Sequence, residues 1–150
     1  MTAPADPYDL ARFVDAQNAV RFGKPKWQAA LEEISEGRKT THWMWYIFPT
    51  LVGVGQSAMA QTYALEGLDE ARAYLAHPVL GPRLKDISAA AATHSGLSAE
   101  AIFGGTDAYK LHNCATLFHA AAPEERVFQD ILDSFYGGAA AEKSARMLGL

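Results

Sequence analysis

The sequence predicts an all-α fold, with residues 1–150 forming a single compact domain of about seven to eight helices. Hydrophobic residues recur at three- and four-residue spacing along most of the chain, as they do on the buried face of a helix. Gly, Pro, Ser and Asp, which commonly begin or end helices, separate these segments. We find no strand–helix alternation and no repeat with a period of about 20–50 residues, which argues against a Rossmann-type sheet and a solenoid.

The first helix is predicted to begin with Asp6 as its N-cap and Pro7 as its first helical residue. Residues 18–25 contain Gly and Pro and are expected to form a loop. A second helix follows at 26–36, where apolar residues lie on one face, and Gly37 ends it.

The aromatic segment 40–49 fits two kinds of structure. Its Trp, Tyr and Phe side chains have strand propensity, yet the segments on either side are predicted to be helical. The preferred interpretation is a short buried helix from Thr41 to about Ile47, ended by Pro49.

The second half of the chain is predicted to be helical apart from short connections. Each segment begins near a capping residue or a proline and ends near glycine or proline. The expected helices are 57–65, 69–76, 79–93, a short turn at 98–103, 108–121, 123–136 and 139–148.

Composition limits the classes of partner. A net charge of −4 gives no electrostatic reason to bind nucleic acid, and no apolar run approaches the roughly 20 residues that span a bilayer. The N-terminal residues lack the charged and apolar regions of a signal peptide. Cys114 is the only cysteine, so no intrachain disulfide can form. We therefore expect a cytoplasmic protein without a nucleic-acid or membrane partner.

The segment 37–45 has the richest combination of chemical groups. Lys39 can contact an anion, His42 can act as an acid or base near neutral pH, and Trp43 or Trp45 can stack on a planar ligand. The alternative is a helix end with favourable cations, a hydrogen-bonded histidine and two core tryptophans. Spacing leaves both interpretations open.

The other candidate groups lie around Cys114. His112 and Cys114 point in different directions on a helix, His119 shares only the face of His112, and no second cysteine is present, so no metal site is predicted. Lys110 lies four residues before Cys114 and could lower the pKa of a nucleophilic thiol. A small buried thiol is the alternative.

Several blocks resemble the bacterial family called domain of unknown function 1810. They are Asp6–Gln17, His42–Pro49, Ser57–Ala64, Glu70–Leu84, Ile102–Gly104, Lys110–Leu111, Thr116–Phe118 and Val127–Gly138. The resemblance covers nearly the whole chain and implies a mainly helical domain. Members are often labelled "calpastatin", but those inhibitors are disordered, whereas this chain is 49% hydrophobic and can fold. Residues 18–25, which look like an insertion, and the tail from Ala139 to Ser144 depart from the family pattern.

Two functional hypotheses follow. In the first, the protein is an enzyme or binding protein for a planar, anionic, nucleotide-like molecule, with His42 as acid/base and Lys39 as an anion contact. Other helices would contribute Tyr63, His77 and Lys110 to the same site. In the second, the protein is a non-enzymatic interaction module, with a homodimer as one form of it, in which His42 and the tryptophans are core or interface residues. No particular cofactor is indicated.

Overall fold

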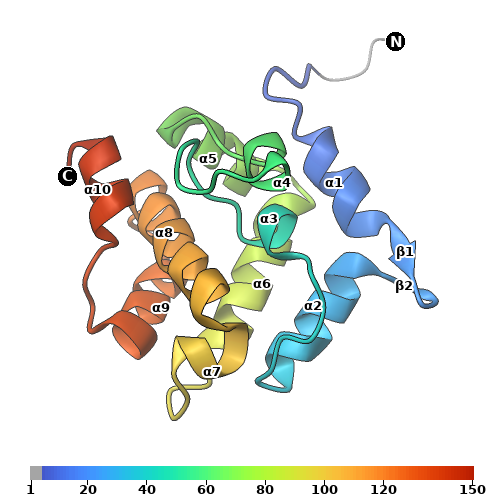
Figure 1. Cartoon of the computed structure of the whole chain (residues 1–150). Helices are drawn as coiled ribbons and strands as arrows, with labels where there is room; N and C mark the ends of the chain where they lie inside the picture. Colours follow the sequence, from blue (N-terminus) through green and yellow to red (C-terminus); the bar gives the residue numbers. More distant parts are fainter. Residues whose placement is uncertain (1–4) are drawn as a thin grey trace.

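The computed structural model describes residues 5–150 and is mainly helical within them (Figure 1). The helices are α1 (Ala11–Asn18), α2 (Lys26–Ser35), α3 (Met44–Ile47), α4 (Ala58–Thr62), α5 (Leu68–Ala76), α6 (Leu80–Ala92), α7 (Ala99–Phe103), α8 (Gly105–Ala121), α9 (Arg126–Tyr136) and α10 (Glu142–Leu148). The predicted fold class is thus confirmed. Ten helices in the described residues exceed the seven to eight predicted, and α3, α4 and α7 have only four or five residues each.

The longest helix, α8, lies against α5, α7, α9 and α10, and α6 contacts α2, α5 and α9. In Figure 1 the C-terminal helix α10 and the N-terminal pair α1 and α2 lie at opposite sides of the molecule, with α6 and α8 between them. Large buried side chains from all these regions form one hydrophobic cluster. The largest of them are Trp43, Tyr74, Phe13, Phe48, Phe118 and Phe128. No helix in residues 5–150 is both long enough and apolar enough to cross a membrane.

A β-hairpin occupies the segment that was predicted to be a loop. Strands β1 (Val20–Arg21) and β2 (Lys24–Pro25) pair antiparallel. The turn between them has positive φ at both central residues, 53° at Phe22 and 81° at Gly23, as a two-residue hairpin turn requires. Phe-Gly is not a usual sequence for such a turn, which explains why the sequence pattern did not reveal it.

Two predicted helix boundaries are wrong for reasons that the structure identifies. The first helix begins at Ala11, because positive φ at Asp9 interrupts the preceding turn, although the Asp6 carboxylate still accepts hydrogen bonds at this end. The helix predicted to extend to Leu65 ends at Thr62, because the Leu65 backbone pairs with Thr50 and Val52 instead. Side-chain and backbone bonds outside the local helix therefore decided these ends.

Candidate functional site

The Glu33 carboxylate, in the last turns of α2, organises the segment that follows the helix. Oε1 accepts hydrogen bonds from the backbone N–H groups of Thr40 (2.6 Å) and Thr41 (2.8 Å) and from Trp43 Nε1 (3.2 Å). Oε2 accepts one from Thr41 Oγ1 (2.6 Å). Burial alone would raise the pKa of Glu33, but these hydrogen bonds outweigh it and leave the pKa below its ordinary value. These backbone bonds explain why α3 begins at Met44 and not at the predicted Thr41.

Lys39 holds the same segment to α8. Its Nζ donates to the Thr41 backbone oxygen (2.6 Å), pairs with Asp107 Oδ2 (2.9 Å) and lies 4.9 Å from the centroid of the Trp43 ring. Only 6% of the Lys39 side chain is exposed. Its ammonium group therefore already has partners inside the protein, and Lys39 is not among the anion contacts of the site that we propose below.

His42 lies at a hollow of about 360 Å³ between this segment and the hairpin. Its side chain is exposed, whereas Trp43 and Tyr46 beside it are buried. Burial raises the pKa of Tyr46 to about 12, so its phenol remains protonated at neutral pH. The lining residues are Arg21, Phe22, Lys26, Ala29, Thr41, His42, Trp43 and Tyr46. We call this space the hairpin hollow.

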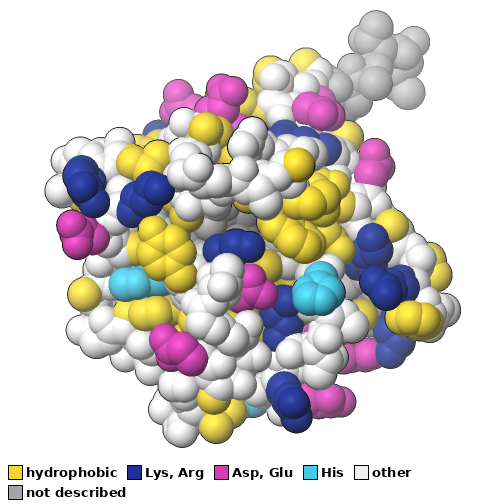
Figure 2. Space-filling view, viewed as in Figure 1, with side chains coloured by type: hydrophobic (Ala, Val, Ile, Leu, Met, Phe, Trp, Pro, Cys, Tyr) yellow, Lys and Arg dark blue, Asp and Glu magenta, His cyan; other side chains and the backbone are white. Residues whose placement is uncertain are grey.

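Basic and aromatic side chains surround the hairpin hollow, and no carboxylate lines it. The Arg21 guanidinium lies 4.9 Å from the centroid of the Phe22 ring, and Lys26 Nζ lies 5.7 Å from that of Tyr46. Within residues 5–150, neither Arg21 nor Lys26 forms an ion pair with a carboxylate. Figure 2 shows Lys and Arg side chains gathered at the hairpin edge of this face. Neither cation stands out in the sequence, because Arg21 lies in a segment predicted to be a loop and Lys26 is simply the first residue of the predicted second helix.

Trp45, Tyr63 and Lys110 come together at a second, separate hollow of about 260 Å³. Lys110 Nζ lies 5.4 Å from the Trp45 ring centroid and 3.6 Å from Asp107 Oδ1. The rings of Tyr46 and Tyr63, one from each hollow, have centroids 5.5 Å apart. The predicted cluster is therefore divided between two neighbouring hollows by its own aromatic residues.

His77 lies at the junction of α5 and α6, and lines neither hollow. Its Nδ1 accepts hydrogen bonds from the backbone N–H groups of Val79 (3.1 Å) and Leu80 (3.2 Å). This arrangement caps the beginning of α6 in the way that a short polar side chain does. The structure therefore gives His77 a role in joining two helices.

Cys114 is buried in α8, and desolvation raises the pKa of its thiol well above the usual value. Lys110 does not lower the pKa of this thiol, because its ammonium group pairs with Asp107 and lies over the Trp45 ring. In residues 5–150 no three His, Cys, Asp or Glu side chains are grouped as metal ligands would be. The environment of Cys114 is that of a small hydrophobic core residue.

A family model described as "Protein of unknown function (DUF1810)" matches residues 7–148. The chain belongs to this family. Among solved structures, it is similar to the conserved hypothetical protein Rv1873 from Mycobacterium tuberculosis. The two share 40% sequence identity and a TM-score of 0.90, over 97% of this chain and 99% of the other. No curated protein matches the chain. The matched range contains both the hairpin and the C-terminal helix of this chain.

Proposed function

We propose that this protein binds a planar, anionic small molecule of the nucleotide type in the hairpin hollow. One observation carries the proposal: three basic side chains, Arg21, Lys26 and His42, surround an aromatic-walled space in which no carboxylate is present to neutralise them. Unpaired cations of this kind favour an anionic ligand.

Each side chain has a role in the proposed site. Arg21 and Lys26 contact the anionic group, and Phe22 and Tyr46 provide aromatic surface for the planar group. His42 contacts the ligand and, if the protein is an enzyme, acts as the acid or base, because its exposed imidazole lines the hollow and can reach a bound molecule. Trp45, Tyr63 and Lys110 form a neighbouring subsite in this proposal.

The conformation of Phe22 supports a role at the rim. Its backbone has φ of 53°, which is unfavourable for a bulky residue, and its side chain is 84% exposed. Packing in the core cannot explain a large apolar side chain in this position. The hairpin turn requires positive φ at this position, but Asn, Asp or Gly suits it better than phenylalanine, so the turn does not account for the choice of residue. Contact with a planar ligand accounts for an exposed phenylalanine at this position.

Isothermal titration calorimetry with adenosine 5′-monophosphate, adenosine and ribose 5-phosphate tests the proposal, since the latter two each lack one recognised group. We expect the complete nucleotide to bind most tightly. Phe22→Ala should weaken binding by about tenfold, in line with the strength of stacking on an aromatic ring. Lys26→Gln should weaken binding by a similar factor and should reduce its dependence on salt concentration.

Matched controls change residues that do not line the hairpin hollow. Tyr109→Ala removes another exposed aromatic ring, and Arg126→Gln removes another exposed cation. Equal binding by the hollow variants and these controls would show that the site is misplaced. His42→Ala separates binding from catalysis: in an enzyme it should abolish turnover of a bound ligand, and in a binding protein it should change affinity only.

The interaction-module hypothesis receives support from a different feature of the same hairpin. Val20 and Phe22 are 67% and 84% exposed, and an apolar pair of this kind can also meet a second copy of the chain. Sedimentation velocity of the wild type and Phe22→Ala distinguishes the two hypotheses. Loss of a dimer in the variant, without binding of any test compound, would favour the module. Both hypotheses keep the protein in the cytoplasm, which suits a chain with one buried cysteine.

A further inference from the structure

A second basic group lies on the other side of α2 from the hairpin hollow. Gln17, from α1, is 1% exposed, and its Nε2 donates hydrogen bonds to the Tyr46 backbone oxygen (2.8 Å) and the Tyr74 hydroxyl (3.2 Å). Its Oε1 accepts one from a terminal nitrogen of Arg83 (3.2 Å). A guanidinium group can only donate, so the amide oxygen must face it. Core contacts therefore orient Gln17, and Gln17 orients Arg83.

Arg83 makes few polar contacts for an arginine held in this way. A guanidinium group has five N–H donors, and only the bond to Gln17 is formed with a protein acceptor in residues 5–150. No carboxylate in that range pairs with Arg83, and the nearest acidic residue on its own helix, Asp86, is exposed. Burial lowers the pKa of Arg83, the direction expected for a partly desolvated cation without a counter-ion.

Arg12 shows what a structural arginine looks like in the same molecule. It donates hydrogen bonds to the backbone oxygens of Tyr8, Asp9, Thr62 and Ala64 and to the Glu70 carboxylate, with which it forms an ion pair. Arg12 therefore has few donors left for a ligand. Arg83 differs because its position is fixed while most of its donors remain available.

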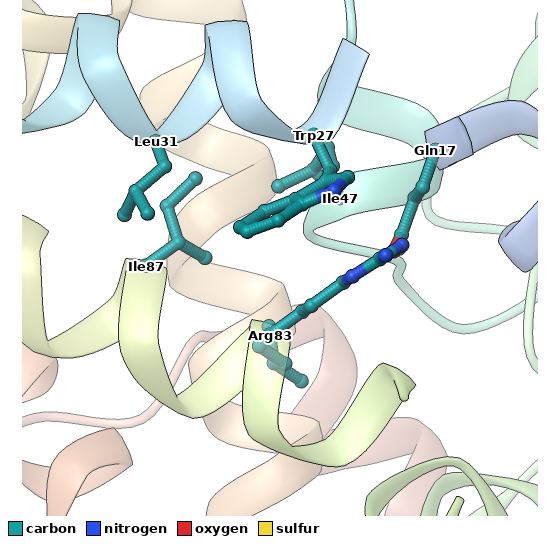
Figure 3. Close-up of a pocket in the computed structure, with 7 residues that line it drawn as sticks. Gln17, Trp27, Leu31, Ile47, Arg83 and Ile87 are labelled. Carbon is teal, nitrogen blue, oxygen red and sulfur yellow. The ribbon is translucent and has the colours of Figure 1, made fainter. Parts of the chain in front are cut away.

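The Arg83 side chain borders a narrow, mainly apolar pocket lined by Gln17, Trp27, Leu31, Ile47, Arg83, Leu84 and Ile87. Its guanidinium carbon lies 4.5 Å from the centroid of the Trp27 ring. Figure 3 shows Arg83 and Gln17 meeting end to end, with the Trp27 ring beside them and Leu31 and Ile87 beyond the ring. The pocket thus has a cationic end and a hydrocarbon wall.

We propose that the mouth of this pocket binds the carboxylate group of a small organic acid, with Arg83 holding the carboxylate and the acid's apolar part lying across the half-exposed Trp27 and Leu31 side chains. A planar guanidinium group matches the two oxygens of a carboxylate in a bidentate geometry. One cation and hydrocarbon walls suit a singly charged acid better than a phosphate dianion, which would retain an unpaired charge. Although Lys26 of the hairpin hollow and Trp27 of this pocket are neighbours in the chain, no residue lines both spaces. The two sites can therefore be tested separately.

The test is a two-dimensional ¹H–¹⁵N NMR titration of the labelled protein with sodium isobutyrate, with sodium chloride at equal ionic strength as the reference. We expect saturable shifts of the Trp27 indole N–H and Arg83 Nε–H signals with isobutyrate only. Arg83→Gln should abolish saturable binding. Arg83→Lys, which keeps the charge but not the fork of donors, should weaken it by about tenfold. The lysine variant also answers the question if the glutamine variant does not fold.

Arg21→Gln is the matched control, since it removes an arginine of the hairpin hollow. It should leave the isobutyrate-induced shifts of the Trp27 and Arg83 signals unchanged. Three results would overturn the inference: equal shifts with chloride, unchanged binding in both Arg83 variants, or tighter saturable binding of inorganic phosphate than of isobutyrate. The last would show an oxyanion site without preference for carboxylate.

Discussion

Replacing Glu33 by alanine should loosen the whole segment that carries His42, because one carboxylate holds it. The change removes four hydrogen bonds, three of them to Thr40 and Thr41 and one to Trp43. Each hydrogen bond contributes a net of about 1 kcal/mol. The contribution is smaller at Thr40, which is exposed, because water can replace Glu33 there. The expected loss in the free energy of unfolding is therefore about 2–4 kcal/mol. For a chain of this length, that corresponds to a fall in Tm of roughly 5–15 °C.

Urea unfolding followed by circular dichroism gives the free energy of unfolding, and amide hydrogen exchange locates the change. The backbone N–H groups of Thr40 and Thr41 should exchange faster in Glu33→Ala than in the wild type, because their acceptor has gone. Glu36→Ala is the matched control, since Glu36 is exposed at the end of the same helix and its side chain forms no hydrogen bond or ion pair in residues 5–150. The reasoning would be refuted if both variants were equally stable within about 0.5 kcal/mol.

The pH dependence of stability offers a second readout of the same carboxylate. The pKa of Glu33 is lower in the folded protein than its ordinary value of 4.5, so the ionised form is favoured by folding. Its contribution to the free energy of unfolding is therefore fully present above pH 4.5 and is lost as the pH falls through the lower, folded-state pKa. Glu33→Gln should remove this part of the acid destabilisation and Glu36→Gln should not.

Three further predictions follow from buried positions. Gly81→Ala should lower the free energy of unfolding by more than about 3 kcal/mol, because a Cβ there would lie 2.1 Å from the Leu75 backbone oxygen. Gly105→Ala, with open space around the added Cβ, should be tolerated in the same urea assay. Cys114 should react with a thiol reagent at pH 8 only after denaturant is added, since the thiol is buried and its pKa is raised; rapid reaction in native buffer would contradict this. Lys39→Met should lower the free energy of unfolding by about 2–4 kcal/mol, because the partly buried Asp107 carboxylate then has only the more distant Lys110 as a partner. A change below about 0.5 kcal/mol in thermal unfolding would show that the Lys39–Asp107 ion pair is not important.

Local signals in the sequence located much of the helical framework. The predicted segments 57–65 and 98–103 each begin with a serine, and that side chain accepts a hydrogen bond from the backbone N–H three residues later. Gly137 ends α9 with positive φ, as its position predicted. These features depend on interactions within a few residues, which is why spacing and residue type suffice to recognise them.

The candidate site was predictable only in part. His42 is exposed at a hollow with aromatic walls, and the cations that line this hollow are Arg21 and Lys26 and not Lys39. Asp107, 68 positions beyond Lys39 in the chain, neutralises that lysine. No pattern within the segment 37–45 could have shown this partner, because an ion pair of that kind depends on how α8 packs.

The sequence by itself therefore determined the fold class, most helices and the aromatic character of the region around His42, because periodicity, capping and composition act locally. Only the tertiary structure decided which cations remain unpaired. Arg12 and Lys39 have partners brought from distant helices, whereas Arg83 has no carboxylate partner within residues 5–150. Charge pairing across a fold depends on distances in space, and residue order alone does not specify those distances.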